Sequence, residues 1–279
     1  MLAAMNGSLE ISGAPSGLLD DDLLLRVRGA GPDASLTWRA RLLDDDGRVW
    51  RATAQRPEQL MTRWVPAKEG TGTIAALRSL RPVAIEVRAE AADGRGAART
   101  LIRRFAANGV RARRWRDGLA ATLHAPADAV ACATLVIDAT AGETQLTVAT
   151  LAAPLLASRG VLVLVVGPAR GRAAGAGSAA GQLETARERL ATLPAAGHEI
   201  LVLPALDPFE ADAAQAGDLA PGPPSGDGPS GGLPSRIGVV LPPGVGARDA
   251  QAAAAARAVA WDALLTLLGA RSRERAGAP

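Results

Sequence analysis

The stretch GPSGG at residues 228–232 matches the pattern G-x-S-x-G, in which the central serine can act as a nucleophile. The pattern supports this chemistry only on a sharp turn between a buried strand and a helix, because that turn exposes the serine hydroxyl. Ser230 lies instead within residues 216–235, a segment rich in proline, glycine and serine. This composition is typical of a loop, so we interpret Ser230 as a loop residue and retain it only as a secondary nucleophile candidate.

A serine nucleophile needs a base to take its proton, and the chain contains only two histidines, His124 and His198. His198 precedes the apolar run Glu199–Leu203, so it would lie at the start of a strand. Active sites of parallel sheets form at the opposite ends of their strands. We interpret His124, in the stretch AATLHAPAD, as a structural residue, and we retain His198 as a secondary catalytic candidate.

The other residue patterns predict neither a metal site nor a cofactor. Cys132 is the only cysteine, which excludes an internal disulfide, and its apolar neighbours indicate a core residue. The glycine-rich residues 70–73 and 167–177 are not followed by Gly-Lys-Ser/Thr, as a phosphate-binding loop requires. Ser178 precedes a helical pattern, and we interpret it as a residue near a helix N-cap.

Residues 1–117 are predicted to form an all-β domain. Five runs have the length and partial alternation of strands, and turn signals such as DDDGR and ADGRG separate them. With one or two weaker runs, they suit an immunoglobulin-like β-sandwich of about seven strands, with Trp38 and Trp50 in its core. The five predicted strands span Asp22–Gly29, Ser35–Leu43, Arg48–Gln55, Pro82–Glu90 and Ala97–Phe105.

Residues 118–279 alternate apolar runs with helical patterns, which indicates β-α-β units and a doubly wound α/β sheet. The predicted strands are Cys132–Asp138, Gly160–Val166, Glu199–Leu203 and Arg236–Leu241. The predicted helices are Thr147–Ser158, Gly181–Pro194 and Asp249–Leu268.

This succession of segments resembles the family of acyl-CoA thioesterases and bile acid-CoA:amino acid N-acyltransferases. The stretch LTWRARLLDDDGRVWRATA resembles the N-terminal hairpin of that family. The stretch LVIDATAGETQLTVATLAAPLLASRGVLVLVV resembles its first α/β unit and is the most specific match. The resemblance covers roughly Ser8–Pro204. It implies an immunoglobulin-like sandwich followed by an α/β-hydrolase-like half, shortened here, and acyl-CoA thioesters as substrates.

The resemblance also implies a nucleophile on a sharp turn after the third strand of the second half. That position holds Ala205, which has no attacking atom, and residues 197–216 contain no Ser, Cys or Thr. The catalytic histidine implied by the resemblance would come just before the final helix, where the chain reads VVLPPGVGARDAQ. We therefore expect a vacant nucleophile position and no base.

Five residues are candidate ligand-binding residues by the same resemblance. Asp138, Ala139, Thr140 and Gly142 follow the first strand of the second half, in a loop that would offer a backbone donor to an oxyanion. A polar loop is also what any strand end requires. Asp207 follows the vacant nucleophile position and could instead cap the next helix.

Charge is distributed unevenly over a chain whose formal net charge is +3. Residues 1–116 contain 20 of the 31 Lys and Arg but 13 of the 28 Asp and Glu. The arginines between Arg99 and Arg116 could bind the phosphates of coenzyme A or nucleic acid, or form a solvated strand edge. Trp115 is the only aromatic residue among the last four arginines, Arg111–Arg116, too little to stack bases, so we do not expect a nucleic-acid partner.

The apolar runs, such as residues 160–167, are much shorter than the ~20 residues that cross a bilayer. The N-terminal residues lack the pattern of a signal peptide, and we expect a cytoplasmic protein without a membrane partner. Two functions stay open. One is acyl-CoA thioester hydrolysis or acyl transfer with reduced or lost activity. The other is a non-catalytic pseudoenzyme that binds an acyl or CoA ligand or a protein, including a second copy of itself.

Overall fold

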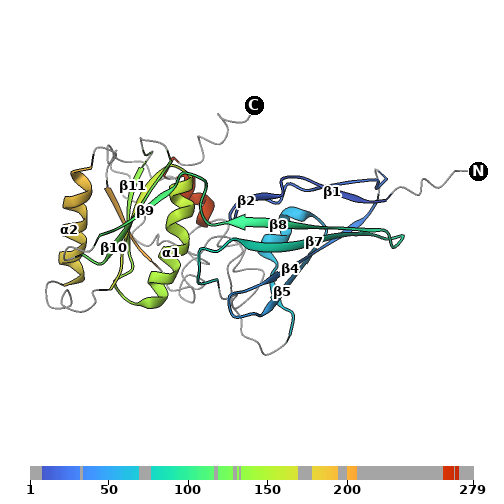
Figure 1. Ribbon diagram of the computed structural model, residues 1–279, viewed down its shortest axis with the longest axis horizontal. Helices are drawn as coiled ribbons and strands as arrows, with labels where there is room; N and C mark the ends of the chain where they lie inside the picture. Colours follow the sequence, from blue (N-terminus) through green and yellow to red (C-terminus); the bar gives the residue numbers. More distant parts are fainter. Residues whose placement is uncertain are drawn as a thin grey trace, which may run out of the picture. The chain divides into compact units, whose positions relative to one another are not determined.

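The computed structural model describes residues 8–31, 34–68, 77–115, 119–127, 131, 133–168, 178–193, 200–205, 260–266 and 268–269. Contacts between Cα atoms divide the chain into two compact units. Described residues up to Phe105 belong to the first unit, and those from Ala106 onward belong to the second. The described part contains three sheets and few helices, so the fold is mixed α/β and mostly sheet (Figure 1).

The first unit is built on a six-stranded sheet in the order β2-β8-β7-β4-β5-β6, and β1 pairs with β3 in a two-stranded sheet. Alternate residues of β4, β5 and β7 are buried, which places Trp38 and Trp50 in the core as predicted. The strands are β1 (Glu10–Ser12), β2 (Ser16–Leu18), β3 (Arg26–Arg28), β4 (Leu36–Leu43), β5 (Val49–Ala54), β6 (Val65–Pro66), β7 (Val83–Ala91) and β8 (Gly96–Arg104), and a 3-10 helix spans Pro57–Thr62.

The β4–β5 and β7–β8 hairpins share one turn geometry. Gly47 and Gly94 have φ angles of +78° and +84°, in the left-handed region that favours glycine. The N–H of Gly47 donates to the carbonyl of Asp44, and the N–H of Gly94 donates to the carbonyl of Ala91, both at 3.0 Å. This is a β-turn followed by a left-handed residue, a common hairpin connection. The turn signals DDDGR and ADGRG thus predicted the positions of both turns correctly.

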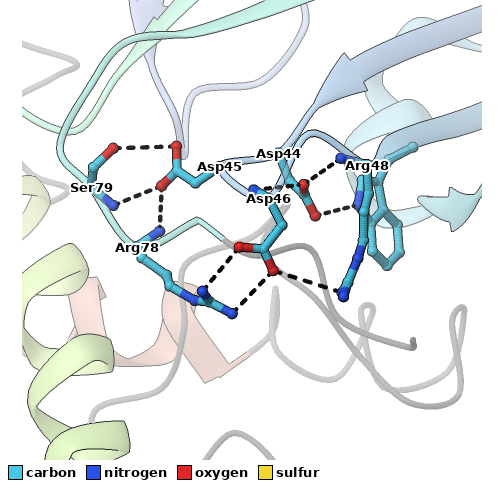
Figure 2. A network of polar contacts seen from close by, with 7 residues as sticks. Asp44, Asp45, Asp46, Arg48, Arg78 and Ser79 are labelled. Atoms are coloured by element: carbon cyan, nitrogen blue, oxygen red, sulfur yellow. Dashed lines mark hydrogen bonds and ion pairs between the residues drawn. The ribbon is translucent and has the colours of Figure 1, made fainter. Parts of the chain in front are cut away.

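Three consecutive aspartates, Asp44–Asp46, fix the first of these turns (Figure 2). Asp44 is only 5% exposed, and its carboxylate accepts hydrogen bonds from two backbone N–H groups of the turn and from the Trp50 indole at 3.0 Å. The other two aspartates bind Arg78, one through its backbone N–H and one through its guanidinium. Because protein donors satisfy these carboxylates, the cluster stabilises the turn.

The second unit contains a five-stranded sheet in the order β13-β11-β12-β10-β9. The strands β11, β12 and β13 are parallel, β10 is antiparallel to β12, and β9 is antiparallel to β10. Residues of β9 precede position 117, where we predicted the boundary, but they pair along their whole length with β10. The strands are β9 (Arg111–Trp115), β10 (Ala121–Ala125), β11 (Ala133–Asp138), β12 (Val161–Val166) and β13 (Ile200–Pro204).

Two helices cover opposite faces of this sheet (Figure 1). Helix α1 (Glu143–Ser158) begins before its predicted start at Thr147, and almost every residue from 148 to 157 is buried. Helix α2 (Ala179–Ala191) buries only one stripe and packs Ala186 and Leu190 on the sheet. Its N-cap is Ser178, whose hydroxyl accepts from the Gly181 N–H, as predicted.

Several predicted segments lie outside the described residues: the loop at 216–235, the strand Arg236–Leu241 and most of the final helix Asp249–Leu268. Residues 260–266 of that helix are described and helical, and Trp261 is buried. In the part of the chain that the structure describes, no helix has both the length and the apolar composition needed to cross a bilayer.

Candidate functional site

The carboxyl ends of β11 and β13 mark the candidate site of the second unit. From β11 the chain passes through α1 to β12 on one side, and then through α2 to β13 on the other side of β11. The connections therefore leave the β11–β13 pair in opposite directions, which is a topological switch point. Open α/β sheets bind ligands at the carboxyl ends of the strands beside such a point.

Ala205 directly follows β13 at this edge and is 6% exposed. Its backbone N–H donates to the Asp138 carbonyl at 2.7 Å, so the residue continues the ladder between β13 and β11. A methyl side chain can neither attack a carbonyl carbon nor transfer a proton. The position where the sequence predicted a vacant nucleophile is therefore an ordered, hydrogen-bonded strand end.

Asp138 ends β11 and lies half-buried at the same edge. Its Oδ1 accepts from the Thr140 backbone N–H at 3.0 Å and from the Thr140 hydroxyl at 2.6 Å. This local turn orders the loop after the strand. Within the described residues Oδ2 of Asp138 has no hydrogen-bond partner, so this oxygen can accept a hydrogen bond from a ligand.

The Thr140 hydroxyl is not arranged for nucleophilic attack. A hydroxyl nucleophile is normally activated by an adjacent base such as histidine, whereas Thr140 donates its proton to a carboxylate. A carboxylate is a weak base toward an aliphatic alcohol. The Asp138–Thr140 pair can therefore bind polar groups, and within the described residues no base contacts it.

Two backbone N–H groups at this edge are engaged within the protein. The N–H of Ala139 donates to the Val166 carbonyl at 2.8 Å, and the N–H of Ala205 is bound as described above. Gly142 is the N-cap of α1, with an extended φ of 166° and no side-chain cap, and its carbonyl accepts from the Leu146 N–H. An oxyanion hole needs donors that point at the reacting group, and neither Ala139 nor Ala205 supplies one.

His124 lies on β10 and is 4% exposed, as its structural interpretation predicted. In the strand register His124 lies beside Val163 of β12, on the sheet face opposite to the one that Ala186 and Leu190 of α2 cover. Burial disfavours the charged imidazolium and lowers the pKa of His124 from 6.5 to about 4. A neutral histidine that is buried on β10, two strands away from β11, is not placed to exchange protons with a ligand at the β11–β13 edge.

Three predicted site residues, Ser230, His198 and Asp207, lie outside the described residues, as does Cys132. Their roles stay predictions. Among the residues that are described, no three His, Cys, Asp or Glu side chains come together to hold a metal ion.

The predicted arginine run separates into buried and exposed parts. Arg103 of β8 is 3% exposed and donates to the Leu18 carbonyl at 3.3 Å. Burial lowers the pKa of Arg103, although the charges of Asp21 and Asp20 oppose this shift. The arginines of β9 are exposed on an edge strand of the second sheet. Arg103 is therefore a structural residue and is not available to a phosphate.

One concave surface was missed by the sequence analysis. A hollow of about 530 Å³ lies on the exposed face of β4, β5 and β7 in the first unit. The sequence signal for this surface was the occurrence of arginines at alternate positions of one strand, such as Arg39 and Arg41. Only the pairing of the strands places them beside Arg51 and Arg88.

A scan against protein-family models and a search of curated proteins found no match to this chain.

Proposed function

We propose that this chain is a reduced member of the acyl-CoA thioesterase and bile acid-CoA:amino acid N-acyltransferase family, in which hydrolysis or acyl transfer is weakened or lost. The sequence resemblance between roughly Ser8 and Pro204 suggests the lineage. The geometry at the end of β13 supports the loss of activity.

The strand order of the second sheet supports an α/β-hydrolase-like half. The strands β9 and β10 form an antiparallel pair at one edge, and β11 lies between β12 and β13. The first five strands of an α/β-hydrolase sheet are arranged in the same way. In that arrangement the nucleophile follows the fifth strand, which corresponds to β13.

The two sheets of the first unit are compatible with the immunoglobulin-like sandwich of the same proposal. Strand β1 contributes the buried Ile11, and the guanidinium of Arg99 on β8 donates to the Ile11 carbonyl at 2.9 Å. A core packed between two sheets is what a sandwich requires.

The observation that carries the functional proposal is Ala205 at the end of β13. By the resemblance this residue occupies the nucleophile position; its side chain is a methyl group, and its N–H donates to the Asp138 carbonyl. Oδ2 of Asp138, which accepts no hydrogen bond from the described residues, favours binding over catalysis. We therefore propose an acyl or CoA ligand at this edge, and the non-catalytic form of the proposal also allows a protein partner or a second copy of the chain. The compartment we propose is the cytoplasm.

The proposal is tested with acyl-CoA thioesters of short, medium and long chain length. Release of free thiol measures catalysis, and isothermal titration calorimetry measures binding. We expect thiol release no faster than the blank, together with saturable binding of at least one chain length. Asp138→Asn should weaken that binding, whereas Glu184→Gln, which neutralises an exposed residue of α2, should leave it unchanged.

Ser230→Ala provides the control for catalysis. Thiol release that disappears in Ser230→Ala would show that the predicted loop forms the active nucleophile, and the vacant site would be the wrong interpretation. Absence of both thiol release and binding would contradict an acyl-CoA ligand altogether.

A further inference from the structure

The hollow on the first unit has a lining unlike that of an acyl pocket. It lies on the solvent face of the six-stranded sheet, and charged side chains dominate its wall. Pockets for apolar ligands are lined mostly by hydrophobic residues, so this one suits a polar ligand. The lining residues are Arg39, Ala40, Arg41, Arg51, Ala52, Thr53, Glu86, Arg88 and Glu90.

Strand register places arginines directly opposite one another in this hollow. Arg41 of β4 faces Arg51 of β5, and Arg39 of β4 faces Arg88 of β7. Directly opposite side chains of an antiparallel pair have Cβ atoms about 5 Å apart, and like charges there are destabilising. Two such pairs on one sheet face carry a cost in the free protein that a bound anion would remove.

The two glutamates of the hollow neutralise only part of this charge. Glu90 pairs with Arg39 at 2.9 Å, and Glu86 is shared between Arg88 at 3.1 Å and Arg41 at 3.9 Å. Arg51 has no ion pair with any residue that the structure describes. The Arg41–Arg51 end of the hollow is thus its most positive part, and the Thr53 hydroxyl lies in the same lining.

We infer that this hollow binds phosphate groups of a small molecule, with Arg41 and Arg51 as the principal ligands of the phosphate oxygens. A guanidinium presents a planar fork of N–H donors that matches two phosphate oxygens. A diphosphate carries enough negative charge to offset the repulsion within both opposed arginine pairs. This site is separate from the strand edge of the second unit, and it does not depend on acyl-CoA hydrolysis or on the family proposal.

Isothermal titration calorimetry with pyrophosphate at low ionic strength tests the inference on the full chain. We expect saturable binding that Arg51→Gln and Arg41→Gln each weaken about tenfold, the loss expected for one charge-assisted contact. Arg28→Gln removes the same charge from an exposed position on β3 outside the hollow, and it should leave the affinity unchanged. Arg51→Lys keeps the positive charge but loses the planar fork of donors. Its affinity for pyrophosphate should therefore lie between that of the unaltered chain and that of Arg51→Gln.

Thermal unfolding without ligand separates binding from folding. Because Arg51 faces Arg41, Arg51→Gln should unfold at the same temperature as the unaltered chain or higher, while losing the stabilisation by pyrophosphate.

Tighter binding of a nucleoside diphosphate than of pyrophosphate would identify a nucleotide as the ligand, and equal binding would show that the phosphates alone are recognised. The inference is wrong if pyrophosphate does not saturate the protein or if Arg28→Gln loses as much affinity as Arg51→Gln. Binding of a glutamate-rich peptide that pyrophosphate cannot displace would likewise overturn it.

Discussion

Burial determines what the ionisable side chains of this protein can do. Arg103 is enclosed beside β2, where its guanidinium donates to the Leu18 carbonyl, whereas Arg51 is exposed on the open face of the same sheet. His124 is buried on β10, and its lowered pKa keeps it neutral near pH 7, so it does not serve as an acid or a base. The sequence had predicted a structural role for His124, which its burial confirms, but residue type alone could not separate the buried Arg103 from the exposed arginines of the same run.

The buried His124 makes stability depend on pH. The pKa of His124 is about 4 in the folded protein, against 6.5 for an exposed histidine. Between these two pH values the unfolded chain therefore binds a proton at this histidine that the folded chain does not bind. The contribution is complete above about pH 6.5 and decreases as the pH falls toward 4, by about 3 kcal/mol in total. Urea unfolding at several pH values measures it. We expect His124→Gln to reduce the slope of unfolding free energy against pH in this window.

The other histidine supplies the matched control for this pH series. His198→Gln changes the same residue type and should leave the slope near that of the unaltered chain. If His124→Gln and His198→Gln give the same slope, burial of His124 does not set the pH dependence.

The hairpin turns show how one residue conformation fixes an element. In both turns of the first unit a glycine adopts positive φ, and the turn sets the register in which the following strand pairs. That register is what aligns the arginines of β4 with those of β5 and β7. The turns therefore determine the charge pattern of the hollow, although they are not part of it.

Gly47→Ala should destabilise the first unit through backbone conformation alone. A Cβ at Gly47 would meet no atom within 4 Å, so the expected loss of about 1–2 kcal/mol comes from φ +78°. Thermal or urea unfolding measures the loss. Gly31→Ala is the control, because Gly31 also has open space but no positive φ, and it should be neutral or slightly stabilising. Equal losses in both variants would exclude the conformational explanation.

The whole molecule consists of two units with separate cores. The first buries residues of its six-stranded sheet such as Trp50, and the second buries residues of α1, α2 and the five-stranded sheet. A unit with its own core can unfold on its own. Two such units in one chain depart from two-state behaviour.

Differential scanning calorimetry should therefore resolve two transitions. Gly47→Ala should lower the midpoint of one transition, and acidification from pH 6.5 toward 4 should, through His124, lower the other. The two perturbations lie in different units, so their effects should be assigned to different peaks. A single transition that moves with both perturbations would show that the units unfold cooperatively.

Local patterns in the sequence were sufficient for most of the individual elements. Alternation predicted β4, β5, β7 and β8, apolar runs predicted β11 and β12, and helical periodicity predicted α1 and α2. The absence of Ser, Cys and Thr from residues 197–216, on which the proposed vacancy at Ala205 rests, was also visible. These features depend on residues close together in the chain, where side-chain period and composition act directly.

Pairing between distant residues was decided only by the tertiary structure. It assigned β9 to the second sheet, placed β11 between β12 and β13, and brought the Ala205 N–H to the Asp138 carbonyl. It also set Arg41 opposite Arg51 and enclosed His124. Such contacts depend on which strands pair and in which register, and many pairings satisfy the same local pattern. The sequence by itself therefore determined the strands, and only the packed fold determined their neighbours.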